Sequence, residues 1–260
     1  MKTTSLAIIS AIGLSGAAYA GDTNSISFGS EQCNIEFKND VRIDPQRIEI
    51  TNAQNQHLVF EHGELSIDGK SVELNDQQQQ ALTNYADNVR TYMPEVAQIA
   101  LDGVKIAGVA IEEVGTAFGI QSSDALTELV EQIGVNIEHT FYQNGAFVMG
   151  KKTFEQLGND IENQFDEDFE RAMEQAVLQS IGSVFIALGS ELIGSGGNMD
   201  EFEQRMERLG EQVEQRVELQ AANIEKRADA LCVSFTELAA QEQQLIGMVP
   251  ELKDYQLLSN

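Results

Sequence analysis

The stretch KSVELNDQQQQALTNYADNVRTYM, residues 70–93, contains the point where one periodicity ends and another begins. Its first five residues have the length and β-branched content of a strand. Asn75 is a good helix N-cap, and Gln78 completes a variant of the capping box. Apolar side chains then follow at helical spacing: Leu82, Tyr85 and Val89. The stretch predicts an α+β fold in which a β-rich segment passes directly into a long helix.

Strand patterns fill the chain from Cys33 to Leu74. Four segments alternate apolar and polar residues or are rich in β-branched residues: RIEIT (47–51), HLVFE (57–61), ELSID (64–68) and KSVEL (70–74). Asp68-Gly69 is a hairpin signal, because a type I′ turn needs positive φ at both central positions. His62-Gly63 is expected to turn the preceding pair. These features predict a small antiparallel β-meander, which needs a cover on one face to be stable.

Pro94 either kinks the first helix or starts a new one. A stripe of small and apolar residues follows it: Ala97, Ala100, Val104, Ala107, Ile111, Val114 and Phe118. Glycines at 103, 108 and 115 weaken this helix unless a partner approaches closely, so we expect tight packing. Four charged residues argue against a transmembrane span: Asp102, Lys105, Glu112 and Glu113. A further helix is expected from Ser123 towards His139.

The last third has the most regular helical pattern. Apolar residues recur every three or four positions from Phe154 to Met173 and run into a segment at 176–193 that is apolar almost all round. The sequence GSGGN at 194–198 interrupts the pattern, which resumes from Phe202 to Leu238. Two long segments joined by a short glycine turn predict an antiparallel helical hairpin. A linker between independent domains is the alternative interpretation of residues 194–198.

The first twenty residues have the features of a secretory signal peptide. Lys2 precedes an apolar run, and small residues lead to an A-x-A cleavage site that ends at Ala20. We expect cleavage after Ala20 and export to the periplasm, although an N-terminal core helix is the alternative. The expected organisation is a signal peptide at 1–20, a β-rich region at 21–75 and a helical bundle at 76–260 that folds together with the sheet.

The charge balance limits the classes of partner. The chain has 42 acidic and 16 basic residues, a net charge of −26. Nucleic acid is excluded as a partner, because phosphate binding needs clustered cations. Anionic membrane surfaces would repel the chain unless divalent cations bridge the two. Solvated helix faces account for the carboxylates, and diffuse calcium binding is a minority alternative because no EF-hand loop pattern occurs.

One segment begins like a phosphate-binding loop. GAFVMGKKT, residues 145–153, has the spacing of the Walker A motif as far as Lys151, but Lys152 stands where a Ser or Thr must hold magnesium. The intervening side chains are also bulky where phosphates need close backbone approach. We therefore interpret the segment as a short strand or hairpin after Asn144-Gly145.

No combination of residues predicts a catalytic, cofactor or metal site. His57 and Glu61 would lie about 13 Å apart on one face of a strand, with His62 on the other face, so they cannot converge on a metal. Three carboxylates one helical turn apart are typical of a solvated stripe: Asp166, Glu170 and Glu174. Ser195 has no identifiable histidine partner. An enzyme is therefore unsupported, and no cofactor is expected.

The two cysteines, Cys33 and Cys232, are expected to form a disulfide. Export places them in an oxidising compartment, and a single pair has only one intramolecular connectivity. Because Cys232 lies beside the apolar stripe of the last helix, the bond would tie the first strand to that helix. A catalytic thiol and a chance pair of buried thiols are the rival interpretations.

Several scattered stretches resemble the YggN-like family of exported Gram-negative proteins. They are Cys33, Asp44-Pro45-Gln46, Asp68-Gly69-Lys70 before Leu74-Asn75, Tyr85, Arg90 before Pro94, IALD at 99–102, SGGN at 195–198, and Cys232. The resemblance covers most of the chain, and the sequence departs most from the family pattern between residues 120 and 175. It implies a periplasmic location and the same cysteine pair, and it implies no activity.

The leading functional hypothesis is a non-enzymatic interaction or chaperone-like protein in the periplasm, with an acidic surface. Its partner would be an envelope protein. One alternative is a helical oligomeric assembly, since the sustained helical stripe could pair between chains. Another is a carrier of an apolar ligand between the helix at 97–118 and the segment at 176–193. An enzyme with an unrecognised active site is the remaining alternative, and the sequence leaves the oligomeric state open.

Overall fold

The fold is that of a computed structural model, which describes residues 25–26, 33, 35–117, 124–164, 171 and 199–259. The expected signal peptide at 1–20, the apolar segment at 176–193 and the glycine turn at 194–198 lie outside these residues. So do the candidate side chains Asp166, Glu170, Glu174 and Ser195. The hypotheses about them stay predictions.

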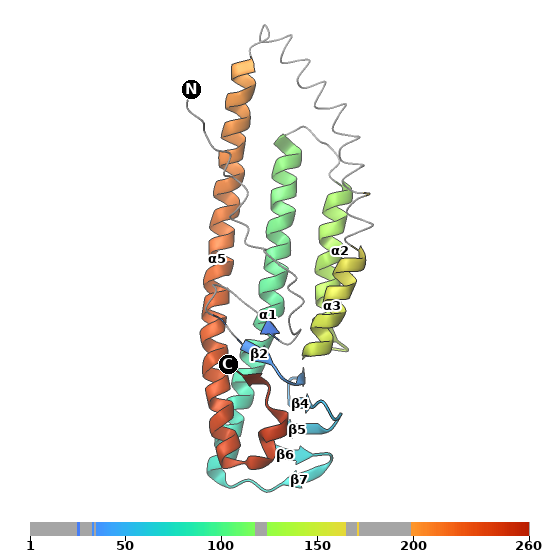
Figure 1. The fold of residues 1–260 in the computed structure, drawn as a ribbon, viewed down its shortest axis with the longest axis vertical. Coiled ribbons are helices and arrows are strands. Elements are labelled where there is room, and N and C mark those ends of the chain that lie inside the picture. The colour runs from blue at the N-terminus through green and yellow to red at the C-terminus, as the bar shows by residue number, and fades with distance from the viewer. Residues whose placement is uncertain are drawn as a thin grey trace.

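Long helices and antiparallel strands make up the described chain, which confirms the predicted α+β class (Figure 1). The helices are α1 (Asp76–Ala117), α2 (Asp124–Phe141), α3 (Lys151–Gln164) and α5 (Met199–Met248), and the 3₁₀-helix η2 (Pro250–Tyr255) follows α5. Because each residue adds 1.5 Å, the 50 residues of α5 span about 75 Å. Figure 1 shows α1 and α5 side by side, with the strands at one end of the helices.

The larger sheet has seven strands in the order β7-β6-β5-β4-β3-β9-β8, all antiparallel. The first five follow one another in the chain: β3 (Asp40–Ile43), β4 (Arg47–Thr51), β5 (His57–Glu61), β6 (Glu64–Ile67) and β7 (Lys70–Val72). This arrangement confirms the predicted meander. The predicted hairpin is also present, as β8 (Tyr142–Gln143) and β9 (Ala146–Met149), and β9 pairs with β3.

Three tight turns have the conformation that their sequences predict or allow. In each pair both residues have positive φ: 52° and 83° at His62-Gly63, 48° and 75° at Asp68-Gly69, and 53° and 80° at Asn144-Gly145. Positive φ at both central positions is the type I′ condition. Glycine accepts this backbone without a steric cost, and Asn and Asp tolerate it better than other residues.

One face of the larger sheet packs on the helices. Burial alternates along β4 and β5, so that Ile48, Ile50, Leu58 and Phe60 are buried while their neighbours are partly exposed. The buried side chains belong to the same core as residues of α1 and α5, among them Val89, Met93, Phe235 and Leu238. The helices are therefore the cover that the meander needs.

A second, three-stranded sheet joins the two ends of the described chain. Its order is β1 (Ser25–Ile26), β2 (Ile35–Phe37) and β10 (Leu258–Ser259), and both pairings are antiparallel. Ile35 and Phe37 are buried, as are Leu257 and Leu258. The division of the chain at residue 75 stays a prediction, although strands from beyond it complete both sheets.

The glycine pattern of α1 predicts tight packing, which the structure does not show at Gly103, where an added Cβ would meet nothing within 4 Å. A Cβ added at Gly108 of α1 would lie 3.6 Å from Val130 of α2, and one at Gly134 of α2 would lie 3.6 Å from Val104 of α1. Pro94 lies inside α1 and starts no new helix. The expected helix towards His139 is α2. The first arm of the predicted helical hairpin is described only as far as the end of α3, so the hairpin stays a prediction.

Candidate functional site

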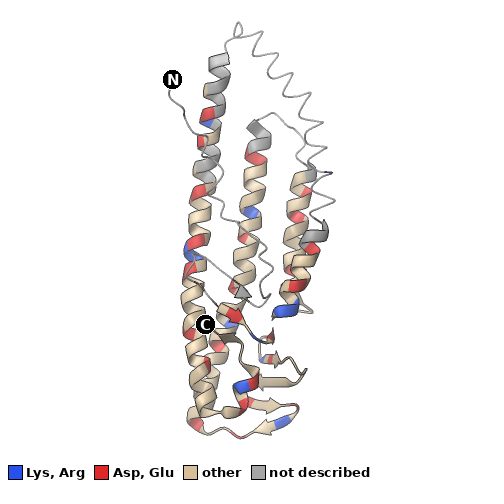
Figure 2. Cartoon of the chain, in the orientation of Figure 1, with Lys and Arg blue, Asp and Glu red and all other residues tan. Residues whose placement is uncertain are grey.

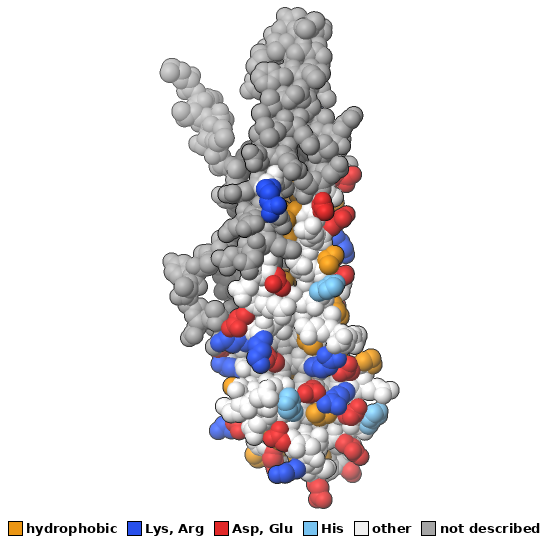
Figure 3. All heavy atoms as spheres, turned by 90° about the vertical axis from the view of Figure 1, so that its right-hand side faces the viewer, with side chains coloured by type: hydrophobic (Ala, Val, Ile, Leu, Met, Phe, Trp, Pro, Cys, Tyr) orange, Lys and Arg blue, Asp and Glu red, His pale blue; other side chains and the backbone are white. Residues whose placement is uncertain are grey.

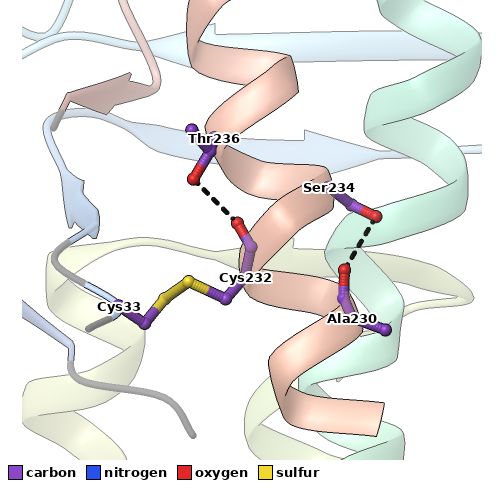
Figure 4. The surroundings of a disulfide bond; sticks show 5 residues. All are labelled: Cys33, Ala230, Cys232, Ser234 and Thr236. Atoms are coloured by element: carbon purple, nitrogen blue, oxygen red, sulfur yellow. Dashed lines mark hydrogen bonds between the residues drawn. A yellow bond between two sulfur atoms is a disulfide. The ribbon is translucent and has the colours of Figure 1, made fainter. Parts of the chain in front are cut away.

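The predicted disulfide joins Cys33, two residues before β2, to Cys232 in α5 (Figure 4). The two Cα atoms lie 5.8 Å apart although 199 positions separate them in the chain. Cys33 is buried, with 4% of its surface exposed. The bond therefore attaches the residue that shortly precedes β2, the central strand of the smaller sheet, to the C-terminal half of α5.

A buried carboxylate lies about three helical turns further along α5. Only 5% of Glu242 is exposed. Its Oε1 accepts hydrogen bonds from the Tyr85 hydroxyl at 2.5 Å and the Leu257 backbone N–H at 2.7 Å. Its Oε2 accepts from the Leu258 backbone N–H at 3.0 Å. One side chain thus connects α5 to α1 and to the end of the chain.

The surroundings of Glu242 shift two pKa values. Burial raises the pKa of Glu242 to about 7, because removal from water disfavours the charged form, while the three hydrogen bonds oppose that rise. Burial and the neighbouring Glu242 charge raise the pKa of Tyr85 well above its usual value. Glu242 can therefore gain or lose a proton near neutral pH, while Tyr85 stays protonated.

Further hydrogen bonds hold the last described residues, 249–259, which we call the C-terminal strap. The Asn39 side-chain amide donates to the Asp254 carbonyl at 3.1 Å and to the Gln256 carbonyl at 2.7 Å. The Lys38 backbone N–H donates to the Leu257 carbonyl at 2.9 Å. Together with the pairing of β10 and β2, these bonds fix the strap between α5 and the start of the larger sheet.

A partly exposed ionic cluster connects α1 and α5 nearer their middles. Arg227 pairs with Asp102 and, at 3.2 Å, with Glu95, while Lys105 lies 2.9 Å from Asp102. Hydrogen bonds from Lys105 and Arg227 lower the pKa of Asp102. The cluster joins the two helices through the ion pairs of Arg227 with Glu95 and Asp102.

The open face of the larger sheet carries the histidine that the sequence singles out. His57 Nδ1 lies 2.8 Å from Glu49 on the adjacent strand, and the other oxygen of Glu49 lies 2.7 Å from Arg47. Thr51 Oγ1 also contacts His57 Nδ1, at 3.2 Å. A catalytic triad needs a carboxylate on one ring nitrogen and a nucleophile on the other, whereas both contacts here are made to Nδ1.

The expectation that His57, Glu61 and His62 form no metal site stays a prediction. His62 Nε2 lies 3.1 Å from Gln46 Oε1, and His62 Nδ1 lies 3.9 Å from a carboxylate oxygen of Glu61. Over the described residues, no group of three His, Cys, Asp or Glu side chains could hold a metal ion. Figure 3 shows charged and histidine side chains gathered on the surface of the lower part of that view.

The segment that begins like a Walker A motif has another role. Its glycine Gly150 lies against Asp40, since an added Cβ would come within 2.6 Å of the Asp40 Cα atom. Lys152 lies 3.6 Å from the Asp40 carboxylate. A carboxylate therefore occupies the neighbourhood where a phosphate would need to bind, and the glycine permits β3 and the start of α3 to meet.

Helix α5 exposes apolar side chains along one face. Leu219 is 75% exposed and Val233 is 60% exposed. Exposed alanines lie on the same side of the helix, at the three- and four-residue spacing of one face: Ala222, Ala230 and Ala240. We call these five residues the α5 outer face. In the described part of the chain, no helix is long and apolar enough to span a membrane.

The charged residues along the described part of α5 are mainly acidic (Figure 2). Exposed carboxylates of α5 include Glu207, Glu211, Glu218, Glu225 and Glu237. Among the α5 residues with described exposure, the exposed cations are Arg208 and Lys226. The face therefore combines accessible apolar surface with nearby carboxylates, and Lys226 lies at the same helical spacing, between Ala222 and Ala230.

Neither Glu242 nor Tyr85 is among the candidate site residues that the sequence predicts. A usable signal exists, because Glu242 falls at helical spacing between Leu238 and Leu245, which are both buried. A carboxylate on the apolar stripe of a helix is rarely buried without partners. The partners Leu257 and Leu258 carry no comparable signal, since they bind through their backbone.

Comparison with known proteins yields a family and nothing beyond it. No curated protein and no solved structure matches the chain. A family model described as "Protein of unknown function (DUF2884)" matches residues 33–258 and so begins at Cys33 and takes in Cys232, Glu242 and all but the last residue of β10. By this match, the chain belongs to the DUF2884 family of proteins of unknown function.

Proposed function

We propose that the protein is an exported, non-enzymatic interaction protein of the periplasm that holds unfolded envelope polypeptides in a chaperone-like manner. The observation that carries the proposal is the α5 outer face, where Leu219 and Val233 are more than half exposed on a helix that also exposes carboxylates. Exposed apolar surface rimmed by polar residues is typical of interaction sites. The expected client is a segment that is both apolar and cationic.

Export is supported by the cysteine chemistry and by the N-terminal sequence. Disulfides persist in oxidising compartments and are rare in the cytosol. The bond between Cys33 and Cys232 fits such a compartment, as do the predicted signal peptide and the resemblance to YggN-like proteins. These three observations are independent of the α5 outer face.

The size of the face suits weak and reversible binding. Full burial of one Leu or Val side chain contributes about 1.5–3 kcal/mol, which is less than a stable complex requires. The net charge of −26 adds long-range attraction for cationic chains and speeds their encounter at low salt. Several short contacts along α5 would therefore hold a client without trapping it.

An aggregation assay tests the proposal. A basic model protein is heat-denatured in the presence of the full chain, and light scattering reports its aggregation. We expect the wild type to suppress scattering, more strongly at low salt than at high salt. The double variant L219E/V233E should lose most of this effect.

The matched control is Q220E/Q243E, which adds the same charge at exposed positions of α5 that are not among the five residues of the outer face. It should retain full suppression, because it leaves the apolar contacts intact. Unchanged aggregation in the presence of the wild type would contradict the proposal. An equal loss in both double variants would assign the effect to charge alone and would remove the outer face from it.

A further inference from the structure

The C-terminal strap depends on one ionisable side chain. Both oxygens of Glu242 are used, and two of their three donors are the consecutive backbone N–H groups of Leu257 and Leu258. These two groups leave the carboxylate if the strap moves away. The protonation of Glu242 is therefore linked to the position of the strap by the geometry itself.

Both protonation states of Glu242 are compatible with the closed strap. The ionised carboxylate accepts from all three donors. A neutral carboxyl needs an acceptor for its proton, and the Tyr85 oxygen, 2.5 Å from Oε1, can serve because a phenol both donates and accepts. The closed states thus differ chiefly in the cost of burying a charge, which is absent when the acid is neutral.

We propose that Glu242 is a pH-dependent latch: a neutral Glu242 keeps the C-terminal strap closed, and its ionisation increases the population of an open strap in which water hydrates the carboxylate. The elements that move are β10 and the strap residues next to it. Opening would expose the backbone of β2 at Glu36 and Phe37, which β10 pairs in the closed form. The proposal is independent of the α5 outer face.

The other charged groups near the site lie on the elements packed against this end of α5. On β2 and the residue after it, Glu36 pairs with Lys38 and accepts from Ser259 at 3.3 Å. On η2, Glu251, Lys253 and Asp254 are exposed, and Tyr255 is buried with a pKa raised by burial. On α1, Tyr85 contacts the carboxylate, and Asp87 pairs with Arg90 at 3.1 Å.

The direction of the effect follows from linkage. Burial raises the pKa of Glu242 from 4.5 to about 7 in the closed form, whereas the hydrated open form has the ordinary value. The closed form therefore binds the proton more tightly. Closure is favoured in full below about pH 4.5, and this advantage is lost as the pH rises through about 7. Between pH 5 and pH 8.5 the opening equilibrium should increase roughly 10²-fold.

Hydrogen exchange of the full chain tests the latch. Exchange at the Leu257 and Leu258 amides, corrected for the intrinsic pH dependence of exchange, is followed by NMR between pH 5 and pH 8.5. The amides of Ile48 and Ile50, in the interior of the larger sheet, serve as the internal reference. We expect the protection of the two strap amides to fall roughly 10²-fold over this range relative to the reference.

Two variants separate the latch from general loosening. Glu242→Gln should abolish the pH dependence, whereas Glu237→Gln, at an exposed position of the same helix, should leave it unchanged. A wild-type change below about threefold, or an unaltered profile in Glu242→Gln, would overturn the proposal.

Discussion

Removal of the disulfide offers the largest predicted change in stability. The double variant C33A/C232A cuts the covalent connection between β2 and α5 and leaves no free thiol that could form another bond. We expect the variant still to fold, because β2 remains paired with β10 and the strap remains bound to Glu242.

The magnitude follows from the length of the closed loop. A disulfide restricts the unfolded chain, and the entropy it removes grows with the logarithm of the number of residues enclosed. For the sequence separation of 199, the chain-entropy relation gives about 5 kcal/mol at 25 °C. Replacing the buried Cys33 by alanine also removes a sulfur atom from the core, which adds a smaller cost.

Urea denaturation followed by circular dichroism measures this change. The free energy of unfolding should fall by about 5 kcal/mol in the double variant, and the m-value should rise because the unfolded chain becomes more expanded. Wild-type protein in a reducing agent serves as the second comparison and should approach the variant. A loss below about 1 kcal/mol with an unchanged m-value would refute the assignment of the bond as a main stabilising link.

Three further measurements test particular contacts. Gly150→Ala should destabilise the protein by about 1–3 kcal/mol, because the new Cβ would meet the Asp40 backbone. Gly158→Ala, inside α3 with open space around it, should stabilise the protein by up to about 1 kcal/mol. Equal effects of the two variants in a denaturation experiment would contradict this packing. Phe235→Ala should lower the free energy of unfolding by about 3–5 kcal/mol in the same experiment, because Phe235 is fully buried and packs edge-on against Phe37 with 5.8 Å between the ring centroids. A loss below about 1 kcal/mol would mean that the core around Phe235 is not packed as described. As the pH rises from 4.5 to 8, the unfolding free energy of the wild type should fall by up to about 3 kcal/mol relative to that of Glu242→Gln. The reason is that the pKa of Glu242 is raised in the folded state, so this group favours folding only while it is protonated. A difference between the two proteins that stays constant across this range would refute this prediction.

Local signals predicted most of the fold. The start of α1 depends on a reciprocal pair of hydrogen bonds at 2.9 Å between Asn75 and Gln78, which is the capping geometry that their spacing indicates. Likewise, the Asp68-Gly69 and Asn144-Gly145 turns determine their hairpins within a few residues. The disulfide needed no local signal, because two cysteines leave one intramolecular pairing.

The periodicity of the sequence could not predict pairing between strands that are far apart in the chain. Strand β9 pairs with β3 about a hundred positions away, and β10, with two residues, is too short to show an alternation at all. The site around Glu242 depends on the same kind of contact, because its backbone donors at Leu257 and Leu258 are brought there by tertiary packing. A buried acid on an apolar stripe can be recognised from sequence, whereas the identity of its backbone partners cannot.

The binding of a short peptide tests the proposed function most directly. A labelled peptide of alternating lysine and leucine is titrated with the full chain at low salt, and fluorescence anisotropy reports binding. The account predicts saturable binding that weakens with salt, falls at least about tenfold in L219E/V233E, as expected for losing 1.4 kcal/mol or more, and is unchanged in Q220E/Q243E. Equal binding of a peptide with glutamate in place of lysine, or equal affinity in the two double variants, would contradict a client site on the α5 outer face.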